Sequence, residues 1–465
     1  MNKTQIEQIK EMLIEKNLYG WKIELAEIAR TNMYFTKFLE PEEIMNSNRT
    51  HIVITIYKDY GKEIGESSFN VVEFNKFVIQ EQINNALIIC DYSKKQTFAL
   101  PEKESNLIKK EQLHELNLVD DKLITEQGRK TQLNNVYQAL KKELSLSQHK
   151  DIKPNNLEIY AASSTLRILN SEGVDLSEPK TGFYIELTLT ASKNEKFQKK
   201  IQKKEQEFVA AKDFSSTTQL DVKNFIAHNI NMVRNILNSE LIKTFNGNVI
   251  LSGDAVSEFF APHLSSSPLI MHSSAKIKHM GISRYQLNKP IGTFFRDNLS
   301  ISTNPFMPLN PCSASFDHDG VLSKKVSIIE KGIFKNYLAD KQYADYLNVP
   351  PTGAFGSVDI SGGTSSLDKM YNSYKTLPYI EIVAFSSFVP NNISGDFSAE
   401  IRLGYIVVKD KQGNAIKTPF KGGLFTGNVF KLIENIYISK EIKEETGYKG
   451  PKAVMFENSV VAGIK

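Results

Sequence analysis

The stretch NGNVILSGDAVSEFFAPHL, at residues 246–264, has the pattern from which the second half of this chain is built. Its aliphatic run at 249–251 predicts a strand, which ends at the Ser-Gly-Asp that follows. Asp254 is the predicted N-cap of a helix, because aspartate accepts hydrogen bonds from the free N–H groups of a first helical turn. Pro262 ends or kinks this helix. Its apolar side is made of Val256, Phe259 and Phe260.

A chain of 465 residues is about three times a common domain size, so we expect two domains. The hydrophobic fraction of 41% is ample for a core, and the formal charge of +4 is small for this length. That charge gives no reason to expect nucleic acid or an anionic membrane as a partner. The two cysteines, Cys90 and Cys312, fit a reducing compartment.

The first residues, 1–21, predict an amphipathic helix with Ile6, Ile9 and Leu13 on one side. They lack the uninterrupted apolar segment of a signal peptide. No apolar run in the chain approaches the roughly 20 residues that a membrane helix needs. We therefore expect a cytoplasmic protein with no membrane partner.

The order of the remaining patterns predicts an α+β fold. Period-two alternation indicates strands, and spacings of three and four indicate helices. Asn246-Gly247 is the predicted C-cap of a long helix, and we place the domain boundary there. The N-terminal mixed α/β-hairpin domain, 1–245, has predicted strands at 21–28, 51–57, 67–72 and 183–191, helices at 74–90, 107–116, 131–144 and 220–245, and a tight turn at 170–173.

The second predicted domain, 246–465, is richer in short strands and in Gly, Pro and Ser turns. Alternating segments at 380–384 and 401–408, with a turn at 411–414, predict mainly antiparallel sheets.

Four motifs together resemble the TldD/TldE proteins, also called PmbA or "putative modulator of DNA gyrase". They are the helix described above, FDHDGV at 316–321, SGDFS at 394–398 and FTGN at 425–428. In the TldD branch this helix carries His-Glu-x-x-x-His, with both imidazoles as zinc ligands and the glutamate as general base. Here Ser257 and Pro262 stand at the ligand positions and only Glu258 remains. The C-terminal cysteine ligand of that branch is also absent from 440–465.

The resemblance implies a metal-free TldE/PmbA-like subunit with no catalytic residues and no cofactor of its own. Such a subunit pairs with a TldD-like subunit, which holds the zinc, or with itself as a dimer. The pair acts as a cytosolic metallopeptidase, a hydrolase that cleaves unfolded or extended peptides. An alternative is a homodimeric peptide-binding or scaffold protein with no enzymatic activity. A third is an independent hydrolase that uses Cys312 or the side chains at 317–319.

Several side chains are candidates for a site. Three histidines, His263, His272 and His279, lie close in sequence, but their spacing is not that of a helical ligand pair. Asp317, His318 and Asp319 form either an acid/base set or, as we favour, an Asp-Gly turn before a strand at 321–329. The resemblance makes five residues candidates for lining a peptide channel: Gly395, Asp396, Ser398, Gly427 and Asn428. Glu258, without a metal, is expected to be an inert carboxylate or a salt-bridge partner.

Overall fold

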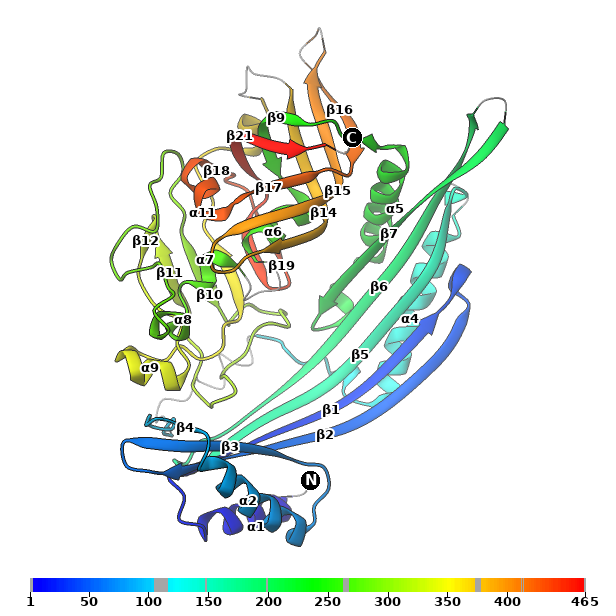
Figure 1. The fold of residues 1–465 in the computed structure, drawn as a ribbon. Helices are drawn as coiled ribbons and strands as arrows, with labels where there is room; N and C mark the ends of the chain where they lie inside the picture. The colour runs from blue at the N-terminus through cyan, green and yellow to red at the C-terminus, as the bar shows by residue number, and fades with distance from the viewer. Residues whose placement is uncertain are drawn as a thin grey trace.

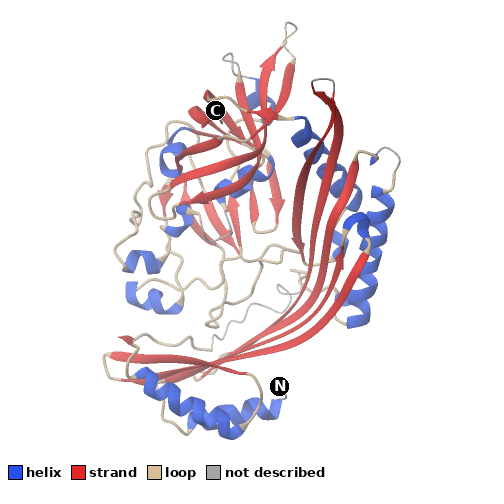
Figure 2. Ribbon diagram, turned by 45° about the vertical axis from the view of Figure 1, so that its right-hand side comes forward, coloured by secondary structure: helices blue, strands red, loops and turns tan. Residues whose placement is uncertain are grey.

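The computed structural model describes residues 3–103, 116–146, 149–197, 200–261, 267–372, 378–410, 412 and 414–463. The helix predicted at 107–116 lies almost entirely outside these residues. The fold is α+β: one long curved sheet holds most of the N-terminal half, and the C-terminal half packs two smaller sheets inside its curve (Figures 1 and 2).

Seven antiparallel strands make the long sheet, in the order β4-β3-β2-β1-β5-β6-β7. Several are far longer than the alternation predicted, because each is paired along its length by an equally long neighbour. Their bounds are β1 (Gly20–Phe35), β2 (Pro41–Asp59), β3 (Glu63–Val71), β4 (Lys94–Gln96), β5 (Ile152–Asn170), β6 (Asp175–Phe197) and β7 (Lys200–Phe214). The predicted turn at 170–173 joins β5 to β6.

Side chains alternate between two faces of this sheet, as strand geometry requires. On the outer face, Trp21 and Ile23 pack against helices α1 (Lys3–Ile14) and α2 (Lys76–Cys90). Farther along β1, Met33 and Phe35 pack against α4 (Glu126–Leu144) and α5 (Val222–Asn238). These helices line the outside of the curve in Figure 2. The inner face, with β1 side chains such as Lys22, Glu24 and Arg30, is turned toward the C-terminal half.

The C-terminal half contains a six-stranded sheet, β12-β11-β10-β13-β20-β19, and an eight-stranded sheet, β14-β9-β21-β17-β15-β16-β8. Most pairings are antiparallel, as predicted, and three are parallel: β13 with β20, β14 with β9 and β16 with β8. The bounds of the first sheet are β10 (Ile301–Asn304), β11 (Val326–Glu330), β12 (Ile333–Phe334), β13 (Ser357–Ile360), β19 (Ile442–Glu445) and β20 (Tyr448–Pro451). Those of the second are β8 (Glu240–Leu241), β9 (Phe245–Leu251), β14 (Tyr379–Pro390), β15 (Asp396–Lys409), β16 (Ala415–Lys421), β17 (Leu424–Asn428) and β21 (Val454–Ala462), with β18 (Ile436–Ile438) paired to β21.

Five strands of the larger sheet close into a ring, because β14 pairs with β15 as well as with β9. Helix α6 (Gly253–Phe260) packs against the inside of this ring. The ring of Phe259 lies 6.1, 6.3 and 5.2 Å from those of Phe388, Phe397 and Phe456, which come from β14, β15 and β21. The predicted strand–helix unit, formed by β9 and α6, is therefore the centre of the C-terminal core.

Five short helices lie on loops of this half: α7 (Pro268–Met271), α8 (Ala275–His279), α9 (Lys341–Leu347), α10 (Leu367–Asn372) and α11 (Val429–Leu432). Short 3-10 turns occur at Lys37–Leu39, Asp121–Leu123, Thr217–Gln219 and Ile433–Asn435.

Two local predictions were wrong. Helix α5 ends at Asn238, and residues 246 and 247 lie in β9, because the chain after the helix is taken up by strand pairing with β16, β14 and β21. The N-cap of α6 is Ser252, and Asp254 is inside the first turn. The domain boundary after 245 stays a prediction, and the eight-stranded sheet already includes β8.

Candidate functional site

Helix α6 carries Ser257 and Glu258 beside a lysine that the sequence patterns did not indicate. Lys443, on β19, places its Nζ 3.1 Å from Ser257 Oγ and 2.5 Å from the carbonyl oxygen of Gly253. The same ammonium contacts Glu445 Oε1 at 3.1 Å. A fixed positive charge therefore lies against the first position of the motif.

Glu258 is partly buried beside this lysine. Burial is the main cause that raises the pKa of its carboxyl to about 7, and Asp254 raises it further. Among the described residues Glu258 makes no ion pair or side-chain hydrogen bond, so it is not a salt-bridge partner there. Lys212 of β7 lies 3.8 Å from Asp254, which brings the long sheet next to α6.

These residues do not fit a zinc ion. The hydroxyl of Ser257 already accepts from an ammonium, whose charge repels a second cation. Within the described ranges no group of three or more His, Cys, Asp or Glu side chains is placed to hold a metal. Pro262, the other motif position, and His263 lie outside those ranges.

The other two histidines do not converge. His272 is buried, with Nε2 2.9 Å from the carbonyl oxygen of Ile393 and Nδ1 accepting from the N–H of Arg284 at 3.2 Å. His279 is exposed at the end of α8 and lies against the rings of Tyr343 and Tyr346. Both have local structural partners.

The SGDFS segment forms a turn and a helix cap. Gly395 has a φ of +79°, and a Cβ there would lie 2.5 Å from the ring of Phe430. The Asp396 carboxylate accepts from Asn428 Nδ2 at 2.8 Å and from Ser394 Oγ at 2.8 Å. These bonds, led by that of Asn428, lower the pKa of Asp396. Asn428 also caps α11 by accepting from two backbone N–H groups.

The channel candidates lie apart from Glu258. Phe397 points into the ring toward α6, so its neighbours Asp396 and Ser398 point to the exposed outside. Gly427 pairs with Phe397 on the adjacent strand. A role of these residues in a peptide channel stays a prediction.

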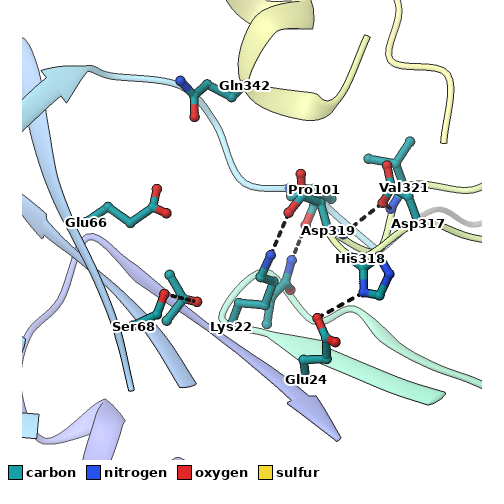
Figure 3. Close-up of polar contacts among 12 residues, drawn as sticks. Lys22, Glu24, Glu66, Ser68, Pro101, Asp317, His318, Asp319, Val321 and Gln342 are labelled. Atoms are coloured by element: carbon teal, nitrogen blue, oxygen red, sulfur yellow. Dashed lines mark hydrogen bonds and ion pairs between the residues drawn. The ribbon is translucent and has the colours of Figure 1, made fainter. Parts of the chain in front are cut away.

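The sequence Asp317-His318-Asp319-Gly320 forms the predicted turn and docks it on the long sheet (Figure 3). The Asp317 carboxylate accepts from the N–H groups of Asp319 and Val321, each at 2.9 Å. Burial raises its pKa to about 6. The following strand was predicted from 321, but β11 begins only at Val326.

Two contacts hold this turn on β1 (Figure 3). Asp319 Oδ1 is 2.6 Å from Lys22 Nζ, and His318 Nδ1 is 3.1 Å from Glu24 Oε2. The hydrogen bond raises the pKa of His318 and lowers that of Glu24. The three polar side chains thus point to different partners and form no common site.

Next to this docked turn, two hollows follow one another along the inner face of the long sheet, and we call them together the trough. One part, about 630 Å³, lies between Leu166, Ser164 and Lys180 of β5 and β6 and loops of the C-terminal half that include 316–319 and 352–355. A second part, about 490 Å³, continues on the next inner-face positions, Ala162 and Gly182. Its further lining includes Arg30, Tyr160, Tyr184, Asp213 and Pro311.

The trough is long enough for an extended chain. From Leu166 to Glu158, β5 spans eight residue steps, about 27 Å of strand at roughly 3.4 Å each. Asp213 adjoins the turn after β19, since Thr446 Oγ1 donates to its carbonyl oxygen at 2.6 Å, and the neighbouring Lys212 lies 3.8 Å from Asp254 of α6. No motif in the sequence indicated this site, although Lys22 and Glu24 alternate with the apolar residues Trp21, Ile23 and Leu25, a pattern that indicates a polar face of β1.

Comparisons with known proteins relate the C-terminal half to a known domain family. The model of the PmbA/TldA metallopeptidase C-terminal domain matches residues 244–463. The C-terminal half of the chain, residues 244–463, therefore belongs to the family of this domain.

Two curated relatives match parts of the chain. A zinc metalloprotease TldD homolog of Saccharolobus solfataricus is 27% identical over 248 residues, 49% of this chain and 52% of the relative. An uncharacterized protein of Methanocaldococcus jannaschii is 23% identical over 304 residues, 63% of this chain and 66% of the relative. The chain therefore spans less than two thirds of either relative.

Solved TldD/PmbA-type structures share the whole fold. A "putative modulator of DNA gyrase" from Bacteroides thetaiotaomicron superposes with a TM-score of 0.77 at 16% identity, covering 100% of this chain and 99% of that one. TldE from Thermococcus kodakarensis gives 0.72 at 18% identity, covering 98% and 100%. In the described part of the chain, no helix is long and apolar enough to cross a membrane.

Proposed function

We propose that this chain is a TldE/PmbA-like subunit that binds extended peptides in its inner-face trough and has no zinc of its own. It acts in the cytoplasm with a TldD-like subunit, which supplies the metal for peptide hydrolysis. The observation that carries this proposal is the Lys443 ammonium, 3.1 Å from Ser257 Oγ at the motif position where a zinc ligand would stand.

The chemistry of α6 supports a subunit without hydrolytic activity. A metallopeptidase needs a metal-bound water and a carboxylate that takes its proton. Here the cation is a lysine held by a carbonyl and a carboxylate, and an ammonium does not lower the pKa of a bound water as zinc does. Glu258 keeps its position, but it has no activated water to deprotonate.

The trough supports a role in holding substrate. Its floor is strand backbone with small side chains, Ala162, Ser164 and Gly182, and an extended peptide fits along it. Lys180, at its edge, donates to the carbonyl oxygen of Ser313 in the C-terminal half and pairs with Glu178, so this wall is preorganised.

The test uses the full chain with and without a TldD-like partner. We expect a labelled unstructured peptide to bind the chain alone, as measured by fluorescence anisotropy. Cleavage should require the partner and its zinc. Gly182→Trp should weaken peptide binding at least tenfold, because a Cβ at Gly182 has no heavy atom closer than 4.0 Å and the indole is free to fill the trough.

The matched control is Val209→Trp, an exposed inner-face position of β7 outside the trough lining. It should bind peptide like the parent chain. Zinc-dependent cleavage by the chain alone would overturn the assignment as a metal-free subunit. Equal binding by the Gly182→Trp and parent chains would exclude the trough as the peptide-binding site. A homodimer that binds peptide but never copurifies with a TldD-like chain would favour the scaffold alternative.

A further inference from the structure

A row of three tyrosines crosses the trough on neighbouring strands. The ring of Tyr160 on β5 lies 5.5 Å from Tyr34 on β1 and 5.3 Å, stacked, from Tyr184 on β6. The next inner-face row has only Ala162 and Gly182 on β5 and β6, so the floor drops beside the rings. This combination makes a pocket with one aromatic wall.

Arg30 forms one end of the pocket. Its guanidinium carbon lies 4.3 Å over the centre of the Tyr160 ring. Its Nε is buried without a hydrogen-bond acceptor, and no carboxylate among the described residues pairs with it. Leaving a buried charged donor without an acceptor costs stability. A ligand oxygen bound next to the Arg30 Nε–H would supply the missing acceptor.

Asp213 on β7 forms the other end. Across the sheet it stands opposite Tyr184 and stays accessible to solvent. Its carboxylate has neither an ion pair nor a side-chain hydrogen bond with any described residue. The surrounding protein raises its pKa by desolvation. An unpaired acceptor therefore faces the same pocket as the unpaired donor.

The two charges are too far apart to satisfy each other directly. β1 and β7 are three strand spacings apart, about 14 Å at roughly 4.8 Å each. The Arg30 side chain shortens this gap, because its guanidinium lies over the Tyr160 ring on the neighbouring strand. A ligand that joins the two charges needs a carboxylate at one end and an N–H donor farther along it. The C-terminal segment of an extended peptide has both groups, whereas in a free amino acid they lie too close together to reach both charges.

We propose that this pocket binds the C-terminal residue of an extended peptide: Arg30 takes the terminal carboxylate, and Asp213 accepts from a nearby N–H of the same chain. The assignment rests on the proposed peptide-binding function and adds which part of the peptide the trough recognises. The Nε–H and a terminal N–H of arginine match the two oxygens of a carboxylate. The Tyr160 and Tyr184 rings then flank the last side chain.

The experiment compares labelled decapeptides of one sequence on the full chain at low salt. One has a free C-terminus, one is amidated, and one is amidated with an internal glutamate. We expect the free acid to bind about tenfold more tightly than either amide, since one charge-assisted contact is worth about that much. Arg30→Met should abolish the difference, and Asp213→Asn should reduce it. Arg49→Met, an exposed arginine on β2 outside this pocket, is the control and should keep the full difference.

Each outcome separates the two proposals. If no peptide binds, the peptide-binding function itself fails. If the free acid and the amide bind equally, peptide binding in the trough is supported, but recognition of the peptide C-terminus is overturned. If the internal glutamate restores binding, the pocket takes an acidic side chain instead, which also overturns the chain end. Competition by millimolar alanine as strong as by the unlabelled free-acid peptide would assign the pocket to a free amino acid.

Discussion

Among single residues, Glu258 shows how burial of a carboxyl group makes stability depend on pH. Its folded-state pKa of about 7 lies above its ordinary value of 4.5, so the folded chain holds the proton more tightly than the unfolded chain. This contribution to stability is complete below pH 4.5 and is lost as the pH rises through 7.

We therefore expect Glu258→Gln to match the parent chain at pH 4 and to be more stable at pH 8 by up to about 3 kcal/mol, since each pKa unit is worth about 1.4 kcal/mol. Urea unfolding at both pH values measures this. Glu400→Gln, at an exposed position of β15, is the control and should shift neither curve. A loss of stability at pH 8 in the Glu258→Gln variant would show that the carboxylate has a partner.

Variants of Gly395 and Asp396 distinguish the effect of backbone strain from the effect of charge. We expect Gly395→Val to lower the free energy of unfolding by about 1–3 kcal/mol, because of its positive φ and the nearby Phe430 ring. Asp396→Asn should hardly change the melting temperature, because the residue is exposed and the amide can still accept from Asn428. If the Asp396→Asn variant keeps its stability but impairs cleavage by the reconstituted pair, the segment does line a channel.

At the level of elements, helix α6 is held by aromatic contacts with three strands, β14, β15 and β21. Phe259 is fully buried among Phe388, Phe397 and Phe456. Phe259→Ala leaves a cavity inside the strand ring, so we expect a loss of about 3–5 kcal/mol. Chemical denaturation measures it, with Phe295→Ala, at a position 61% exposed, as the control. Similar losses in both variants would contradict the packing argument.

Across the whole molecule, the docked 317–319 turn ties the two halves together. Lys22 and Asp319 pair at 2.6 Å with both side chains only partly exposed. A double-mutant cycle of Lys22→Met and Asp319→Asn should give a coupling of about 0.5–1 kcal/mol at low salt, smaller at high salt. A coupling of zero would mean that the turn is held by apolar contacts such as Phe316 alone.

Assembly also concerns the molecule as a whole. The resemblance implies a dimer, and Phe259 and Phe260 contribute nothing to its interface because they fill this chain's own core. Light scattering at micromolar concentration tests whether the chain dimerises alone or only with a TldD-like partner.

Local features of this protein could be predicted from its residues alone. The alternation of 183–191, the strand and helix that became β9 and α6, and the Asp-Gly turn at 319 depend on neighbours a few residues away, so the sequence pattern alone indicates them. The lost ligand positions were readable for the same reason. Even here, competition from distant strands moved the end of α5, because pairing partners are not local.

The candidate site, in contrast, exists only in the folded chain. Lys443 reaches Ser257 across 186 residues of chain. Arg30 and Asp213 face one pocket only because β5 and β6 join β1 and β7 into one sheet. Contacts of this kind depend on strand order and ring closure, and no periodicity along the chain encodes which strands become neighbours.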